Sequence, residues 1–208
     1  MDLWSWLLVA ALAVTVAGLG RHAAVLLVRP NGPDRSQAIA SPARGVLYAF
    51  TWGMMPWAKE STRRHLWAYL RGIIFHAGIA AGFLMPLLIP WQAFVPPAIG
   101  GAVAVLAAVG ALAGVVGLAA RIAEPRLRRL STPDDFFSVG LVSAFLVAAA
   151  SAWALPGARA LFYGLAAATL AYIPFGKIRH CFYYFFSRYF FGLAFGRRGV
   201  IGWGQSHE

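Results

Sequence analysis

Long apolar runs alternate with short polar segments along this chain. A helix that crosses the hydrocarbon of a bilayer needs about 20 consecutive, mostly apolar residues. Five segments meet this requirement, and we predict a membrane-spanning helix in each of them: about 3–28, 66–90, 98–120, 136–155 and 160–187. The pattern therefore predicts an all-α membrane protein with five transmembrane helices, organised as a single membrane domain over residues 1–208.

The long segment between the first two predicted spans, residues 29–65, has a mixed character. It opens with PNGPDRSQ, whose prolines and Asn-Gly pair are typical of irregular structure. The run 45–57 that follows is apolar, but a glycine and a proline break it, and it is too short to cross a bilayer. It either lies in the membrane interface, with Trp52 and Trp57 at headgroup depth, or packs on a partner subunit.

A clear helix start precedes the fourth predicted span. In STPDD, Ser131 or Thr132 can cap the helix, and Pro133 suits its first turn. Asp134 and Asp135 then lie at the positive end of the helix dipole, where carboxylates stabilise a helix. We therefore interpret this acidic pair as a helix start.

Composition and charge agree with a membrane protein. The chain is 60% hydrophobic and 12% charged, whereas soluble domains carry about 25% charged residues. The net charge of +11 would suggest nucleic acid in a soluble protein, but here the cations lie at the ends of the apolar runs, and we expect no nucleic-acid partner. The single cysteine, Cys181, excludes an internal disulfide, and its place beside His180 favours a packed thiol.

The distribution of cations predicts the orientation of the chain. The loop between the first and second spans, the loop between the third and fourth, and the segment after the fifth are basic, whereas the opposite loops carry only Arg159. Because cytoplasmic loops collect Lys and Arg, we expect the N-terminus outside and the C-terminus in the cytoplasm of a cell inner membrane. The cytoplasmic cations are Arg29, Arg35, Arg44, Lys59, Arg63, Arg64, Arg121, Arg126, Arg128, Arg129, Lys177, Arg179, Arg188, Arg197 and Arg198.

Two histidines fall inside predicted spans, where ionisable residues are costly and mark functional candidates. His76 follows about ten residues of the second span, and His180 follows about twenty residues of the fifth, so at ~1.5 Å per residue both lie in the cytoplasmic half of the bilayer. Two such imidazoles suit the axial positions of a haem iron. The alternative is that each histidine makes a hydrogen bond between helices.

The neighbours of these histidines suit a haem as well. Small residues beside His76 leave room for a flat macrocycle: Gly78, Ala80, Ala81 and Gly82. Aromatic residues after His180 can wall it: Tyr183, Tyr184, Phe185 and Phe186. Four cations at the same membrane face can bind the haem propionates through charge-assisted hydrogen bonds: Arg128, Arg129, Lys177 and Arg179. The alternative for each cation is a side chain that reaches out to the lipid headgroups.

Three motifs resemble those of a known family. FHAGI (75–79), PFGKIRH (174–180) and RLRRLSTPDDF (126–136) resemble, in this order, motifs in spans two and five and before span four of the gamma subunit of respiratory nitrate reductase. This subunit is a five-span cytochrome b. The chain also resembles the related membrane cytochromes of heterodisulfide reductases and dissimilatory sulfite-reduction complexes. The resemblance covers most of the chain.

The resemblance implies a function and a site. It implies that His76 and His180 ligate a haem b, and that the chain passes electrons between the membrane quinone pool and the iron–sulfur clusters of a cytoplasmic partner subunit. At the positions of the family's second pair of haem ligands this chain has Pro86 and Phe162. Neither side chain can bind iron, so we expect one haem.

Two other functions remain open. The chain could be a haem-free anchor that holds a soluble complex at the membrane. It could also be a small transporter, with His76 and Arg71 lining a polar path. Colour separates these hypotheses, because a purified cytochrome is red.

Overall fold

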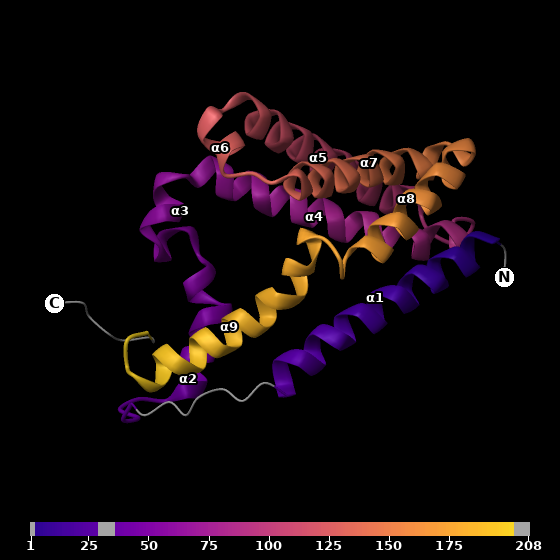
Figure 1. Cartoon of the computed structure of the whole chain (residues 1–208). Helices are drawn as coiled ribbons and strands as arrows, with labels where there is room; N and C mark the ends of the chain where they lie inside the picture. Colours follow the sequence, from indigo (N-terminus) through magenta and orange to yellow (C-terminus); the bar gives the residue numbers. More distant parts are fainter. Residues whose placement is uncertain (1–2, 29–35, 202–208) are drawn as a thin grey trace. The chain divides into compact units, whose positions relative to one another are not determined.

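A computed structural model describes residues 3–28 and 36–201 of the chain, and all of the secondary structure in these ranges is helical. Within them, four helices are long and apolar enough to cross a membrane (Figure 1): α1 (Leu3–Val28), α4 (Leu66–Leu88), α5 (Pro97–Ala123) and α7 (Pro133–Ala154). They coincide with the first four predicted spans and confirm an all-α, multi-pass membrane protein. Residues 29–35, with the predicted cytoplasmic cations Arg29 and Arg35, lie outside the described residues.

The fifth predicted span is divided. It consists of α8 (Arg159–Tyr172) and α9 (His180–Arg197), and a turn at 173–176 separates them. Helix α8 has 14 residues, which at ~1.5 Å each is shorter than the ~30 Å of bilayer hydrocarbon. Pro174 explains the break, because proline has no amide hydrogen to donate and its ring clashes with the preceding helical turn. The two helices are long and apolar enough to cross a membrane only together, as a broken span or a re-entrant loop.

Short helices complete the chain. Among the described residues, four of them lie between α1 and α4, and the others lie in the later connections between the long helices. They are α2 (Pro42–Phe50), η1 (Trp52–Met54), η2 (Pro56–Ala58), α3 (Glu60–Arg64), η3 (Ile89–Trp91), α6 (Pro125–Arg129), η4 (Pro156–Ala158) and η5 (Lys177–Arg179).

The contacts divide the chain into two compact units. The first contains Met1–Gly20 and Leu70–Ile178, and the second contains Arg21–Tyr69 and Arg179–Glu208. The core of the first unit lies among α4, α5, α7 and α8, and α5 runs alongside α7 (Figure 1). Its completely buried side chains include Met85, Phe145, Leu146 and Phe162.

Glycines let the helices of this core approach closely. A Cβ atom placed on Gly78 of α4 would lie 2.6 Å from the Cα of Gly110 on α5. One placed on Gly114 of α5 would lie 2.4 Å from Oγ of Ser143 on α7. Helices in lipid associate mainly through such close van der Waals packing, because the surrounding lipid tails are as apolar as the side chains.

Helix α1 touches the core of this unit through a few contacts and is otherwise exposed. The Thr15 hydroxyl donates a hydrogen bond to the Leu170 carbonyl oxygen at 2.6 Å. One turn farther on, Gly18 packs on the ring of Pro174. The long exposed faces of α1 suit contact with lipid tails, as expected for a membrane span.

A polar clamp closes the predicted outer end of this unit. The Gln92 side-chain amide donates to the Trp153 carbonyl at 3.0 Å. Arg159 donates to Gln92 Oε1 and, through Nε, to the Ala152 carbonyl at 3.3 Å. Arg159 thus satisfies the Ala152 carbonyl at the end of α7, where a cation also complements the helix dipole.

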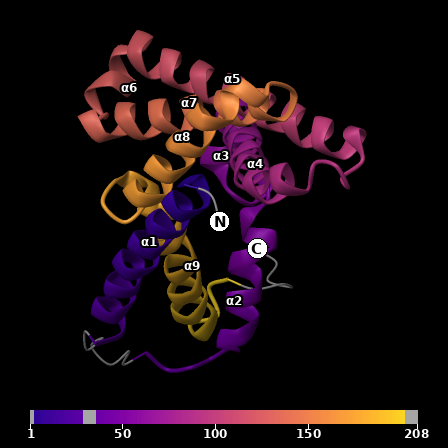
Figure 2. The same cartoon turned by 90° about the vertical axis from the view of Figure 1, so that its right-hand side faces the viewer.

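The second unit is built around a helix pair, α2 and α9, which lie side by side (Figure 2). A Cβ atom on Gly45 of α2 would lie 2.3 Å from the Gly192 carbonyl oxygen and 2.4 Å from the Cα of Gly196. The helical part of the run 45–57 therefore packs on a helix of its own chain. That the run lies in the membrane interface or on a partner subunit stays a prediction.

We predict that Gly110→Ala destabilises the protein by about 1–3 kcal/mol, because overpacking a tight contact forces backbone shifts. The variant is to be compared with wild type by thermal unfolding in detergent. Gly101→Ala, on the same helix, is the matched control, because a Cβ there meets nothing within 4 Å. Equal midpoints for the two variants would contradict the packing role of Gly110.

Candidate functional site

His76 is held by its own helix. Its Nδ1 lies 2.7 Å from the carbonyl oxygen of Gly72, four residues earlier on α4. A carbonyl oxygen can only accept a hydrogen bond, so Nδ1 carries the hydrogen. In the neutral ring the lone pair then belongs to Nε2, which is the nitrogen able to bind a metal. Backbone hydrogen bonds of this kind fix the tautomer and orientation of metal-binding histidines.

The ends of α4 indicate the depth of His76. Trp67 is 85% exposed and Trp91 is 64% exposed, and at ~1.5 Å per residue they lie about 36 Å apart along the helix and the short turn that extends it. Tryptophans at such a spacing are typical of the two interfaces of a bilayer. His76 is nearer Trp67, about 14 Å from it along the axis. For a span that runs between these two tryptophans, this position lies within the hydrocarbon, in the half that begins at Trp67.

Small residues lie on the same face of α4 as His76. Gly72 and Ala80 are one turn to either side of it, and residues four apart share a helix face. A Cβ atom on Gly72 would meet nothing within 4 Å, and Ala80 is exposed. The residues one turn before and one turn after His76 on this face of α4 are therefore small.

Gly78 has a different role from the one predicted. It lies about 200° around the helix from His76, and it is buried against Gly110. Gly82 and Ala81 are buried as well, and a Cβ on Gly82 would lie 2.8 Å from the side chains of Phe145 and Leu146. These residues serve helix packing in place of the predicted haem contact, and of the predicted group only Ala80 lies beside His76.

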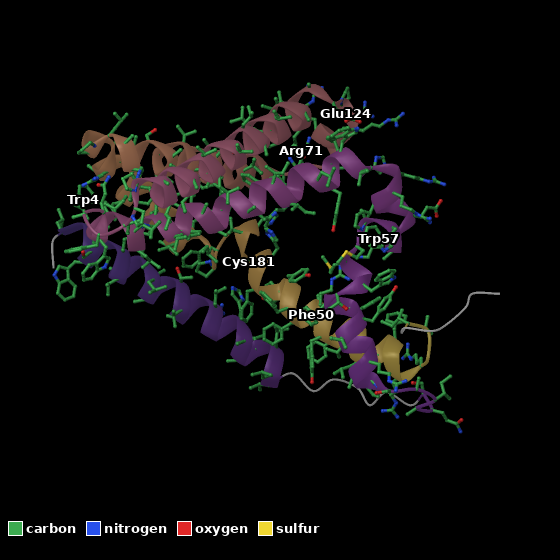
Figure 3. All side chains as sticks on the ribbon, turned by 180° about the vertical axis from the view of Figure 1, so that it is seen from behind. Trp4, Phe50, Trp57, Arg71, Glu124 and Cys181 are labelled. Carbon is green, nitrogen blue, oxygen red and sulfur yellow. The ribbon has the colours of Figure 1, made fainter. Side chains whose placement is uncertain are left out.

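His180 is the first residue of α9, and its side chain is exposed. His76 belongs to the first compact unit and His180 to the second. Cys181 follows His180 and is also exposed (Figure 3), unlike the packed thiol that we predicted. Arg179, a predicted propionate partner, is exposed at the N-cap of α9.

The acidic pair at the start of α7 caps that helix, as predicted. Thr132 and Asp135 form a reciprocal capping box, in which the Thr132 amide donates to Asp135 Oδ2 at 2.7 Å. Asp135 also binds Lys177, whose Nζ donates to Oδ2 at 2.5 Å. Lys177, predicted to bind a propionate, is thus neutralised by a carboxylate of its own chain.

Asp134 fixes the break in the fifth span. Its Oδ1 accepts hydrogen bonds from the Tyr172 hydroxyl and, at 2.9 Å, from the Ser138 hydroxyl. Its Oδ2 accepts the backbone amide of Lys177 at 2.8 Å. Asp134 therefore holds both sides of the turn 173–176 against the start of α7, a role that the sequence pattern of a helix start did not reveal.

The other predicted cations lie on the surface. Arg128 and Arg129 are exposed on α6. Arg121, not among the predicted site residues, donates to the Ser131 hydroxyl at 2.7 Å and lies 3.9 Å from Asp135. Arg71 lies over Gly117 of α5, with Nε 3.4 Å from a Cβ built there (Figure 3).

Tyr183 has a specific partner that we did not predict. Its hydroxyl lies 3.0 Å from Nδ1 of His22, and the two rings meet edge to face with centroids 5.6 Å apart. The sequence does give one indication of a role for His22, because it is an ionisable residue within a 26-residue apolar helix. Of the other predicted wall residues, Tyr184 and Phe185 contact Phe50 of α2 (Figure 3).

The positions corresponding to a second pair of haem ligands are apolar. Phe162 is completely buried and stacks on Phe145, with centroids 6.0 Å apart. Pro86 lies inside α4. Among the described residues, no group of three or more His, Cys, Asp or Glu side chains could hold a metal ion. A haem bound by one histidine from each of two helices does not require such a group.

Comparison with protein families, curated proteins and solved structures finds no significant match to this chain.

We predict that Asp135→Ala destabilises the protein by about 1–2 kcal/mol, because it removes a helix cap and the acidic partner of Lys177. Thermal unfolding in detergent measures the loss. Arg128→Gln is the control, because its side chain is exposed on α6, and surface changes of this kind are usually within about 0.5 kcal/mol. An unchanged midpoint for Asp135→Ala would exclude the capping role.

Proposed function

We propose that this protein is a haem b-containing membrane subunit of a respiratory oxidoreductase complex in the cell inner membrane. In this proposal His76 and His180 are the axial ligands. The subunit relays electrons between membrane quinones and a cytoplasmic iron–sulfur partner subunit, as the resemblance of FHAGI and PFGKIRH to nitrate reductase gamma subunits implies. The observation that carries the proposal is the arrangement of His76, which lies within a membrane span with its Nδ1 held by Gly72.

The residues around His76 fit a haem. The Gly72 carbonyl keeps the hydrogen on Nδ1, so Nε2 would be the nitrogen that binds the metal. Gly72 and Ala80 present no bulky side chain on that face, which admits a flat ring against the helix. When bound, a haem with two histidine ligands supplies reversible one-electron transfer, and the protein contributes binding and electrostatics.

The cations divide into stronger and weaker candidates for the propionates. Arg128, Arg129 and Arg179 are exposed and have guanidinium groups that can form paired hydrogen bonds to a carboxylate. Lys177 is the weaker candidate, because Asp135 already neutralises it. The aromatic wall in this proposal includes Tyr183, whose hydroxyl interacts with His22.

The proposal includes a single haem per chain. At the two positions where the resembled family has its second ligand pair, this chain has Pro86 and Phe162, and Phe162 is buried in the core. The quinone and the iron–sulfur partner rest on the resemblance alone.

We predict that purified protein shows one b-type haem per chain in a dithionite-reduced minus oxidised spectrum, and that His76→Ala and His180→Ala each lose it. Both variants remove an axial ligand. His65→Ala is the matched control, because His65 is an exposed histidine that precedes α4. It should keep the haem.

Three other results would each change the assignment. Two haems per chain would show that other residues supply ligands. Retention of haem in His76→Ala would exclude His76. A folded protein without haem, isolated together with its soluble partners, would favour the haem-free anchor.

We predict that Gly72→Leu lowers the haem content severalfold while the fold is kept. A Cβ atom at position 72 would lie more than 4 Å from the surrounding atoms, so the fold can accept a leucine there. The leucine would place a bulky side chain one turn from His76. Haem per chain and the thermal midpoint are to be measured together. Gly101→Leu is the control with the same change in size on α5, where a Cβ also meets nothing. Full haem content in Gly72→Leu would show that this face of α4 does not contact a haem.

A further inference from the structure

The turns that carry Trp52 and Trp57 are fixed to the start of a membrane span. The Tyr69 hydroxyl, in the first turn of α4, donates to the Met54 carbonyl oxygen at 2.5 Å. The Tyr184 hydroxyl of α9 contacts Met54 Sδ at 3.2 Å. Residue 54 is therefore held at the level where α4 begins, and this is also the level of the exposed Trp67.

The residues at this level are typical of the headgroup region of a bilayer. Trp52 and Trp57 pack edge to face, with centroids 5.7 Å apart, and about half of each side chain is exposed. Trp57 lies beyond the end of α2 (Figure 3). Exposed tryptophans beside the first turn of an apolar span are typical of the membrane interface, where the ring is apolar and its N–H reaches water.

Two cations flank these turns. Lys59 directly follows η2, the turn that contains Trp57. Arg188 is on α9, and its guanidinium carbon lies 5.7 Å from the centre of the Tyr184 ring. Both side chains are partly buried. Burial, and then the positive charge of Arg188, lower the pKa of Lys59. Within the described part of the chain, neither cation forms an ion pair, whereas the neighbouring Arg64 is paired with Glu60.

Two partly buried cations that no carboxylate among the described residues pairs with are suited to bind an anion. An anionic oxygen between them would remove their repulsion and offset the loss of water around the lysine. The bilayer supplies one anion at headgroup depth in quantity, the phosphate of an anionic phospholipid. We propose that Lys59 and Arg188 bind the phosphate group of an anionic phospholipid, with Trp52 and Trp57 contacting the upper part of its acyl chains.

The test is lipid binding by the delipidated full-length protein in detergent, followed by native mass spectrometry during titration with phosphatidylglycerol or phosphatidylcholine. Wild type should prefer phosphatidylglycerol. The double variant Lys59→Gln/Arg188→Gln should bind it more weakly, by about fivefold for each cation removed. The control Arg44→Gln/Arg126→Gln removes the same charge from exposed positions on α2 and α6, and it should bind as wild type does.

Three outcomes would overturn the proposal. Equal affinity of wild type for the two lipids would exclude an anion site, and this comparison needs no variant. Unchanged affinity in the Lys59→Gln/Arg188→Gln variant would place any anion elsewhere. An equal loss in the control variant would show that net charge alone attracts the lipid. A second measurement is the quenching of tryptophan fluorescence by brominated phosphatidylglycerol. Weaker quenching in Trp57→Phe than in wild type would independently support contact between the lipid and Trp57.

Discussion

Close approach of helix backbones is the constraint on which this structure depends. In lipid, apolar side chains gain nothing by leaving the solvent, so helices associate through dense packing and a few hydrogen bonds. In the first unit the backbone of Gly78 meets that of Gly110, and in the second Gly45 meets Gly192 and Gly196. Other parts of the fold follow from these contacts. Because Gly78 turns one face of α4 to α5, His76 is directed to the opposite face, away from the core.

Much of the fold follows from apolar run length. The first four spans were predicted within a few residues, because run length and flanking cations suffice for helices of this kind. The division of the fifth span at 173–176 was not predicted, although Pro174 is visible in the sequence. The residues around Pro174 are apolar, so the run still had the length and composition of a single span. The hydrogen bonds that stabilise the break come from Asp134, almost forty residues earlier in the sequence.

The candidate site was only partly predictable, for a similar reason. The chemistry of a residue is encoded locally, so His76 and His180 were identified by their place in apolar runs. The function of a small or charged residue depends on what it faces. Gly78 lies two residues from His76 but faces another helix, and Lys177 is bound to Asp135. The partner of Tyr183, His22, is distant in the sequence and shares no motif with it.

The contacts between glycines also limit how the chain can vary during evolution. In an ordinary core, a larger residue on one helix can be accommodated by a smaller one on the facing helix. No residue is smaller than glycine, so a side chain added at Gly78 cannot be offset by any substitution at Gly110. The same holds for Gly45 opposite Gly192 and Gly196. At these places the chain has no compensating pairs of substitutions, and divergent sequences with this packing must keep both glycines or separate the helices.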